Sequence, residues 1–342
     1  MTRLRRSDVT GPGIQRRRQG RGFRYQWSSG EKMADPETLE RIKALVIPPA
    51  WKDVWICPWP HGHIQAIGTD AAGRRQYRYH DEWRKRRDTE KFERALAFGS
   101  SLPGLRKAVA SDIARPGLGR QRVVATGIRL LDIGCFRVGS EEYAEENETY
   151  GIATLRHEHV KLDRGDIVFE YTAKGSIMRS VRVKDPDAHK VIRSLRRGRT
   201  PSDDLLAWKK GGSWFDVRAA DLNEYIKAEA GEEFSAKDFR TWSATVYAGV
   251  ALAREHQAKL SVTGRRKAVK RAIVEVAEYL GNTPTVCRSS YVDPRIIDLF
   301  EEGQIIAAPI ALRPDAVDRA GHRRSIEEAV IALLAEPLEA AA

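Results

Sequence analysis

The feature that most constrains the fold of this chain is a change in hydrophobic pattern near residue 85. Before it, short runs rich in aromatic and β-branched residues alternate with turn formers, as in antiparallel strands. Beyond it, most apolar residues recur three or four positions apart, which indicates helices. A chain of 342 residues also exceeds one average domain. The sequence therefore predicts an α+β protein with a small N-terminal antiparallel-sheet domain and a larger, mainly helical domain.

We expect four segments along the chain. They are a basic flexible arm over residues 1–20, a sheet-rich domain over 21–85, a helical domain over 86–325 and an alanine-rich tail over 326–342. Strands are expected at residues 23–27, 54–59, 63–69 and 74–80. A helix should begin at Asp35-Pro36, because an aspartate cap followed by proline is a common helix start. The pattern leaves open whether the tail is a surface helix or partly disordered.

Within the helical domain, the clear strand region lies between residues 154 and 184. Turn residues at 163–165 and 174–176 divide it into three runs, which predicts a three-stranded meander with Lys174 at a hairpin tip. His157 and His159 fall on one face of the first run. Such a pair can bind a metal, but no carboxylate or cysteine completes a shell, so we favour an exposed polar strand face over a metal site.

The charge of the chain points to a polyanionic partner. The formal net charge is +12 and the pI is near 9.7, a balance for which nucleic acid is the first candidate. Basic runs recur along the whole sequence, at residues 16–18, 74–75, 84–87, 193–199 and 265–267. Any one run could equally be a solvated surface. Together they could contact phosphates on several sides of a duplex.

Several classes of protein are disfavoured. No run of 18 apolar residues and no apolar N-terminal segment occurs, so we expect a soluble cytoplasmic protein with no membrane partner. Cys57, Cys135 and Cys287 include no CxxC pair, which argues against a disulfide framework and a zinc site. The segment that begins at Lys174 lacks the GxxxxGK[ST] order of a phosphate loop, which argues against an ATPase.

Residues 280–294, LGNTPTVCRSSYVDP, present Tyr291 just before a helix start at Asp293-Pro294. The turn formers before Tyr291 predict an exposed loop that can hold a substrate. Taken alone, a tyrosine at a helix entry is more often a packed aromatic. A functional role gains support from three further residues. Arg137 is expected at a corner where a helix ends, Lys174 at a hairpin tip, and Arg240 in the first or second turn of a helix capped by Ser235.

These four residue types suit one kind of chemistry. A phenol, with a pKa of about 10, is a poor nucleophile unless cations stabilise its anion. Two arginines, Arg137 and Arg240, can do this and can also hold both non-bridging oxygens of a phosphodiester. A lysine on a hairpin tip can protonate the leaving oxygen. The set therefore predicts metal-free phosphoryl transfer to Tyr291.

Five motifs make the sequence resemble the type IB DNA topoisomerases, specifically their short poxvirus-like and bacterial form. The motifs are FRVGSEEYAEENETYG around Arg137, TAKG around Lys174, KDFRTW around Arg240, LGNTPTVCRSSYVDP around Tyr291 and GRRQYRYH in the sheet domain. The resemblance covers roughly residues 20–305. It implies that the two arginines, the lysine and the tyrosine are catalytic, with Tyr291 as the nucleophile.

The resemblance further implies an enzyme that relaxes supercoiled duplex DNA. Such an enzyme cleaves one strand through a 3′-phosphotyrosyl intermediate, allows strand rotation and religates, without ATP, a metal or another cofactor. It would act at the nucleoid as a monomer that closes like a clamp around double-stranded DNA. The resemblance carries four residues into DNA-contacting positions: Gln76, Tyr77, Tyr79 and Tyr143. Strand alternation supports part of this, because Tyr77 and Tyr79 share one face.

One position departs from the pattern of many relatives. They carry histidine nine residues before the tyrosine, whereas this chain has Asn282, as similar bacterial members do. An amide can donate a hydrogen bond to a non-bridging oxygen but cannot transfer a proton. We therefore assign Asn282 an electrostatic role only.

Two alternative functions stay open. A tyrosine site-specific recombinase uses the same transesterification but normally shows HxxR around the second arginine. Here Lys237 replaces the histidine of that motif, three residues before Arg240, and this difference favours a topoisomerase. Lys237 is also expected to contact DNA and is a second candidate for proton transfer. The other alternative is a basic DNA-binding protein without catalysis.

Overall fold

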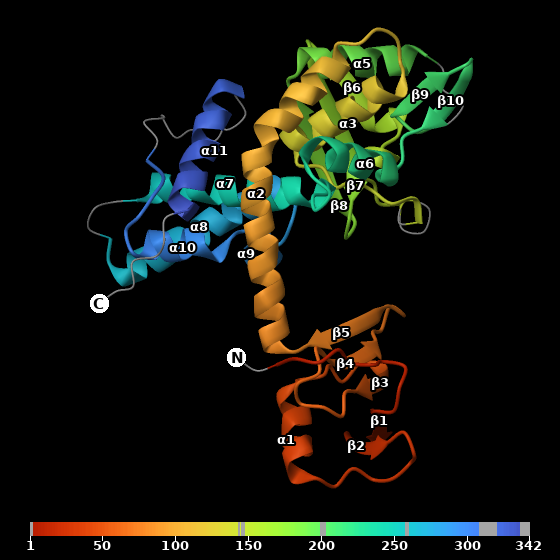
Figure 1. The fold of residues 1–342 in the computed structure, drawn as a ribbon, viewed down its shortest axis with the longest axis vertical. Helices are drawn as coiled ribbons and strands as arrows, with labels where there is room; N and C mark the ends of the chain where they lie inside the picture. Colours follow the sequence, from red (N-terminus) through yellow and green to blue (C-terminus); the bar gives the residue numbers. More distant parts are fainter. Residues whose placement is uncertain are drawn as a thin grey trace. The chain divides into compact units, whose positions relative to one another are not determined.

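The computed structural model describes residues 3–142, 144, 148–198, 203–256, 260–307 and 320–335. The chain divides into two compact units, Met1–Lys91 and Phe92–Ala342, which we call the N-terminal and C-terminal units (Figure 1). The first contains an antiparallel sheet, and the second is mainly helical with a three-stranded antiparallel sheet. This architecture confirms the expected fold class.

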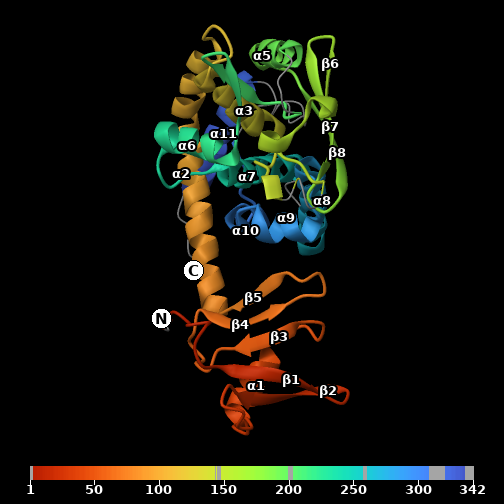
Figure 2. The same cartoon turned by 90° about the vertical axis from the view of Figure 1, so that its right-hand side faces the viewer.

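The N-terminal unit is built on a five-stranded antiparallel sheet in the order β2-β1-β3-β4-β5 (Figure 2). Its elements are β1 (Ile14–Gln19), β2 (Gly22–Trp27), α1 (Pro36–Ala44), β3 (Lys52–Ile56), β4 (Ile64–Thr69) and β5 (Arg75–Tyr79). The helix α1 begins as predicted, because Asp35 accepts a hydrogen bond from Thr38 N at 2.9 Å and proline occupies the first turn. Buried Ile42 then packs α1 onto the apolar side chains of the sheet.

The N-terminal basic run differs from the flexible arm expected over residues 1–20. Its second half forms β1, which pairs with β2 and β3. Arg16 is only 8% exposed. Its guanidinium donates to three carbonyls at 2.8–3.1 Å, those of Ile47, Pro48 and Trp51. Arg16 therefore satisfies backbone acceptors in the folded unit and does not present its charge to solvent.

The C-terminal unit is entered through α2, whose first residues belong to the N-terminal unit. The elements from there on are α2 (Asp81–Ile113), α3 (Arg120–Gly134), η1 (Ile152–Thr154), η2 (His157–His159), β6 (Val160–Asp163), β7 (Asp166–Ala173), β8 (Ile177–Val183), α5 (Pro186–Arg197), β9 (Ala207–Lys210), β10 (Ser213–Asp216), α6 (Ala219–Ala230), α7 (Ala236–Glu255), α8 (Val262–Leu280), α9 (Pro284–Ser290), α10 (Pro294–Glu301) and α11 (Ala320–Ala335). The strands β6, β7 and β8 form the predicted meander.

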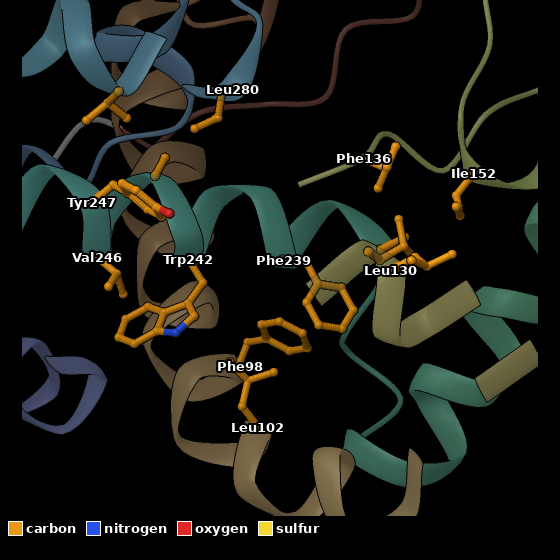
Figure 3. Packing of buried hydrophobic residues seen from close by; sticks show 14 of the residues in the cluster. Phe98, Leu102, Leu130, Phe136, Ile152, Phe239, Trp242, Val246, Tyr247 and Leu280 are labelled. Atoms are coloured by element: carbon orange, nitrogen blue, oxygen red, sulfur yellow. The ribbon is translucent and has the colours of Figure 1, made fainter. Parts of the chain in front are cut away.

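The helix α7 forms the centre of the core in this unit. All its residues from Asp238 to Ala253 are buried. Phe239 meets Phe98 of α2 edge to face, with 4.8 Å between ring centroids (Figure 3). One turn on, Trp242 covers Gly99, where an added Cβ would come within 2.5 Å of the indole. A helix held this closely fixes the position of any functional side chain that it carries.

Four local elements differ from the sequence prediction. The first strand of the meander starts only at Val160, because the preceding residues form the short 3-10 helices η1 and η2. The helix α3 ends at Gly134 instead of near Arg137, with Cys135 in the left-handed conformation. The helix α9 occupies part of the stretch expected as a loop. The strands β9 and β10 form a hairpin outside residues 154–184, where the strands of the helical domain were expected.

The C-terminal boundary expected at residue 326 falls inside α11. Ile326 and Val330 of this helix are fully buried in the core. Glu327 is 4% exposed and accepts a hydrogen bond from Arg106 of α2 at 2.6 Å. Over its described residues, α11 is thus part of the C-terminal unit and not a separate tail.

Two further expectations concern the thiols and the apolar segments. Cys57, Cys135 and Cys287 are buried free thiols. No helix in the described parts of the chain is both long enough and apolar enough to cross a membrane.

Candidate active site

Arg240 is held in the second turn of α7, which is capped at Ser235 as predicted. Its side chain is 3% exposed. The guanidinium donates to Cys135 O at 2.5 Å and to Leu280 O at 2.9 Å. These carbonyls lie at the C-terminal ends of α3 and α8, where helix carbonyls have no intrahelical partner. Arg240 therefore joins three helices and keeps its planar cation in one orientation.

Arg137 lies in a tight corner between α3 and η1. The left-handed Cys135 ends α3, and Gly139 takes a φ of +91° two residues after Arg137. The carbonyl of Arg137 accepts a hydrogen bond from Ile152 N at 2.8 Å. Gly151 lies so close to this corner that an added Cβ would collide with Gly139 N. The backbone on both sides of Arg137 is thus fixed by close packing.

Asn282 follows the end of α8. Gly281 caps that helix in the left-handed conformation, and Asn282 N donates back to Ala277 O at 2.9 Å. The side-chain Oδ1 of Asn282 accepts a hydrogen bond from Arg137 at 2.6 Å. Its Nδ2 is buried and has no hydrogen-bond partner among the residues that the structure describes. A buried amide donor without an acceptor is costly, and it is satisfied when a ligand oxygen enters the site.

Tyr291 follows the last residue of α9 and stands two residues before Asp293, the N-cap of α10. Thr283 caps α9 and Asp293 caps α10, so the tyrosine occupies the short link between two capped helices. Arg137 donates to the Tyr291 hydroxyl at 3.1 Å, and the guanidinium carbon of Arg240 lies 5.2 Å from the centre of the phenol ring. The structure therefore brings together Arg137, Arg240, Asn282 and Tyr291.

The electrostatics of this site favour an anion. Burial on its own raises the pKa of Tyr291, but the charges of Arg240 and Arg137 outweigh it, so the net pKa lies below its ordinary value. Burial and the nearby Arg137 lower the pKa of Arg240. Two close guanidinium groups repel each other, and a bound phosphate relieves that repulsion. Burial raises the pKa of the neighbouring Cys287 thiol to about 11, which keeps it protonated and a weak nucleophile.

The lysines lie on exposed positions of the same unit. Lys174 occupies the tip of the β7–β8 hairpin as predicted, in a turn in which Gly175 and Ser176 have positive φ. Lys237 is exposed in the first turn of α7, three residues before Arg240. The hydrogen bonds and the ring contact given above join Arg137, Arg240, Asn282 and Tyr291.

The candidate DNA contacts of the N-terminal unit lie on β5. Tyr77 and Tyr79 are 42% and 39% exposed, and their rings stack with 6.1 Å between centroids. Gln76 points to the opposite face and donates to Asp70 at 2.9 Å. The predicted alternation along this strand is confirmed. Tyr143 lies outside the described residues.

Sequence reasoning missed Arg179, on β8. This half-buried side chain donates to Cys135 O at 3.1 Å and to Tyr279 O at 2.9 Å. It pairs across the meander with Tyr171, whose pKa is raised by burial despite the nearby arginines. The sequence held a weak signal, because alternation places Arg179 on the buried face of its strand, where a charged residue needs partners.

The interpretation of His157 and His159 as one face of a strand is wrong. They lie in η2, where His159 accepts a hydrogen bond from Arg156 N at 3.0 Å and packs on the ring of Tyr150. Burial lowers the pKa of both imidazoles. Within the described ranges, no group of three His, Cys, Asp or Glu side chains is placed to hold a metal ion.

Comparison with known proteins supports the chemistry of this constellation. Residues 80–302 match the family model of the eukaryotic DNA topoisomerase I catalytic core, and residues 22–70 match the model of the bacterial DNA topoisomerase IB N-terminal domain. DNA topoisomerase 1B of Acanthamoeba polyphaga mimivirus is 33% identical over 84% of this chain and 88% of the viral protein. DNA topoisomerase 1B of vaccinia virus (strain Copenhagen) is 20% identical over 69% of this chain and 72% of the viral protein.

A solved structure of the XerH site-specific recombinase bound to palindromic difH substrate is a more distant neighbour. It is 18% identical, with a TM-score of 0.37, and covers 58% of this chain and 49% of the recombinase. Similarity at this level does not bear on function. The two family models and the 33% identity to the mimivirus enzyme do, and they show that this chain belongs to the type IB DNA topoisomerases.

Proposed function

We propose that this topoisomerase relaxes supercoiled duplex DNA by transient cleavage of one strand through a 3′-phosphotyrosyl intermediate at Tyr291. The observation that carries the proposal is the guanidinium of Arg137, which lies 3.1 Å from the Tyr291 hydroxyl and 2.6 Å from Asn282 Oδ1. This arrangement places a fixed cation beside the nucleophile. Rotation of the cut strand and reversal of the reaction would then relax and reseal the DNA.

In the cleavage step, the Tyr291 oxygen forms a bond to phosphorus and the bond from phosphorus to the 5′ oxygen breaks. The phenol loses its proton to solvent water, which its lowered pKa makes easier. The arginines stabilise the charge that builds on the non-bridging oxygens. Asn282 Nδ2, buried and without a partner, supplies a further donor to one of these oxygens. The charges needed in the transition state thus come from side chains.

The departing 5′ oxygen needs a proton, and we assign its delivery to Lys174. An exposed lysine at a hairpin tip can reach the leaving oxygen of a bound DNA strand, whereas the buried arginines are held in place. Lys237, exposed in the first turn of α7, is the second candidate. Religation reverses these transfers, with the 5′ hydroxyl attacking the phosphotyrosine.

The proposed partner is double-stranded DNA. The net charge of +12 favours binding to phosphates, and the similar mimivirus and vaccinia proteins are named DNA topoisomerases. We propose that Gln76, Tyr77, Tyr79, Tyr143 and Lys237 contact DNA. The exposed, stacked tyrosines of β5 suit contact with bases or sugars. A monomer whose two units close around the duplex would place these contacts and Tyr291 on the same DNA.

A plasmid relaxation assay tests this function. Purified protein should convert supercoiled plasmid to relaxed topoisomers in EDTA and without ATP, because arginines supply the charge stabilisation that other enzymes draw from metals. The matched control is Tyr291→Phe, which should leave the plasmid supercoiled. An absolute requirement for a divalent cation or for ATP would contradict the proposal.

A further inference from the structure

Arg179 occupies the junction between the two halves of the proposed catalytic machinery. On one side are the fixed groups Arg137, Arg240 and Asn282. On the other is the exposed hairpin tip that carries Lys174. Arg179 is the β8 residue nearest to this tip for which the structure gives hydrogen bonds to residues outside the meander. Ile177 and Met178, between it and the turn, are 42% and 70% exposed.

The two acceptors of Arg179 belong to the segments that carry the fixed groups. Cys135 O comes two residues before Arg137, and Tyr279 O comes three residues before Asn282. Cys135 O also accepts from Arg240, so one carbonyl receives two guanidinium donors. A planar fork can reach two carbonyls at once with fixed geometry, whereas an ammonium is a point donor on a flexible stem.

The C-terminal end of α8 is also bound by both Arg179 and Arg240. Its last two carbonyls are satisfied by arginines from different elements: Tyr279 O accepts from Arg179, and Leu280 O accepts from Arg240. Arg179 also packs against Gly281, where an added Cβ would lie 3.3 Å from its side chain. The glycine that ends α8 thus leaves room for a side chain that comes from the hairpin.

We propose that Arg179 is a positioning residue that holds the β7–β8 hairpin, and with it Lys174, in register with Arg137 and Asn282. The inference rests on the proposed function, since Lys174 needs a defined position only if it acts on the leaving oxygen. When Arg179 is removed, Cys135 O keeps its bond from Arg240. Removal of Arg179 should therefore change the position of the hairpin, whereas Arg240 keeps its place beside the Tyr291 ring.

The test measures single-turnover cleavage of a DNA duplex by wild type, Arg179→Ala, Lys174→Ala and the double variant. Arg179→Ala should slow cleavage about 10- to 100-fold, the effect of losing charge-assisted hydrogen bonds, with DNA affinity nearly unchanged. The double variant should cleave no more slowly than Lys174→Ala, because a missing lysine cannot be misplaced further. Additive losses in the double variant would overturn the inference.

Two further variants separate positioning from charge and from general damage. Arg179→Lys keeps the charge but cannot bridge both carbonyls, so it should be nearly as slow as Arg179→Ala; wild-type rates would overturn the inference. Arg182→Ala removes another β8 arginine, which is exposed and pairs with Asp163 and Asp166. This control should cleave at close to the wild-type rate, and a loss equal to that of Arg179→Ala would show a non-specific effect and overturn the inference.

A substrate with sulfur in place of the 5′ bridging oxygen tests the underlying chemistry. A thiolate leaves with little need of a proton, so the substrate should restore cleavage by Lys174→Ala and by Arg179→Ala to a similar extent. Rescue of Lys174→Ala alone would overturn the role of Arg179. If sulfur rescues neither variant, the general-acid role of Lys174 in the proposed function fails, and the double variant still decides whether Arg179 positions the hairpin.

Discussion

Tyr291 and Asn282 meet at one guanidinium, that of Arg137. Each contributes something different: the phenol accepts a hydrogen bond through the oxygen that would attack phosphorus, and the amide leaves its Nδ2 for a substrate oxygen. Arg240 adds a second cation that is buried and locked by two carbonyls. In the proposed mechanism, these contacts assign the attacking oxygen to Tyr291 and the stabilising donors to Arg137, Arg240 and Asn282.

Removing only the attacking oxygen should remove only the reaction. Tyr291→Phe keeps the ring beside Arg240 and loses the acceptor of Arg137. We expect DNA affinity within a few-fold of wild type, because one hydrogen bond contributes about 1 kcal/mol, and no relaxation at all. Gel-shift and plasmid assays on the same preparation measure both. Residual nicking by the variant would mean that another group is the nucleophile.

Asn282 allows a test of the hydrogen bond that its Nδ2 is proposed to donate to the phosphate. Asn282→Asp is nearly isosteric and keeps an acceptor for Arg137, but it replaces Nδ2 with an oxygen that repels phosphate. Asn282→Ala removes the donor and adds no charge. We expect single-turnover cleavage to fall about 10-fold or more in Asn282→Ala, the effect of one charge-assisted hydrogen bond, and further in Asn282→Asp. Wild-type cleavage by Asn282→Asp would show that Nδ2 does not touch the substrate.

How well the sequence predicted the site depended on whether a residue stands at a local boundary. Lys174 at a hairpin tip and Arg240 in the turn after Ser235 could be placed because turn and cap signals are local. Arg179 could not, because its acceptors Cys135 and Tyr279 lie 44 and 100 residues away in the chain. Only the packed fold brings them to β8.

At the scale of elements, the same signals were sometimes present but overlooked. Thr283-Pro284 is a cap followed by proline at the first helical position, as in Asp35-Pro36, and it starts α9 within a stretch interpreted as loop. Gly211-Gly212 links β9 and β10, with Lys210 paired to Ser213, and both glycines have positive φ. Two such glycines are a known hairpin signal, but the charged residues beside them do not show the apolar alternation that predicts strands.

Other elements could not be predicted from local pattern. The residues before Val160 alternate like a strand, yet they form 3-10 turns, because His159 is held by Arg156 N and the ring of Tyr150. The boundary of the tail was expected at residue 326, but α11 starts at Ala320 and is anchored in the unit by Glu327, which pairs with Arg106, 221 residues earlier. Tertiary partners decided the structure of both segments.

The buried charges that anchor α11 should make the C-terminal unit sensitive to acid. Asp132 of α3 accepts from Arg106 and Arg323. Burial alone raises the pKa of Asp132, but the two guanidinium charges outweigh it and lower the pKa. A carboxylate with a depressed pKa in the folded state stabilises the protein above its unfolded pKa of about 4, and this stability is lost as the pH falls through the folded value.

We therefore expect Asp132→Asn to cost about 3–5 kcal/mol at pH 7, because it breaks a buried ion pair and leaves cations uncompensated. The difference from wild type should narrow as the pH is lowered below about 4. Denaturant unfolding at several pH values measures it. The control Asp187→Asn removes an exposed carboxylate paired with Lys190 and should change little. A pH-independent difference would contradict this explanation.

At the scale of the whole molecule, the positive charge is divided between structure and surface. Arg16, Arg240 and Arg323 are used inside the two units, on carbonyls or carboxylates. The formal net charge of +12 counts these arginines together with every other charged residue of the chain. Arg16 belongs to one of the basic runs of the sequence, so fewer side chains of these runs are available to phosphates than the sequence suggests.

Binding to duplex DNA should weaken steeply with salt. Each neutralised phosphate contributes a slope of about −0.9 to a plot of log affinity against log salt concentration. If the units contact about six to ten phosphates, affinity should fall by roughly three to five orders of magnitude between about 50 and 200 mM salt. Fluorescence anisotropy with the Tyr291→Phe variant measures binding without cleavage. A flat response would exclude a charge-driven grip on the duplex.

The proposed function requires that Tyr291 becomes covalently joined to a DNA 3′ end. The most direct measurement is denaturing electrophoresis of the protein mixed with labelled duplex DNA. One duplex carries its label on the 3′-phosphate side of the cut, and another carries it on the 5′ side. Proteolysis and mass spectrometry of the adduct follow. We expect a label on the 3′-phosphate side to migrate with wild-type protein, the modified peptide to contain Tyr291, and Tyr291→Phe to give no adduct. An adduct through a 5′ phosphate or another residue, or relaxation without any adduct, would contradict the account.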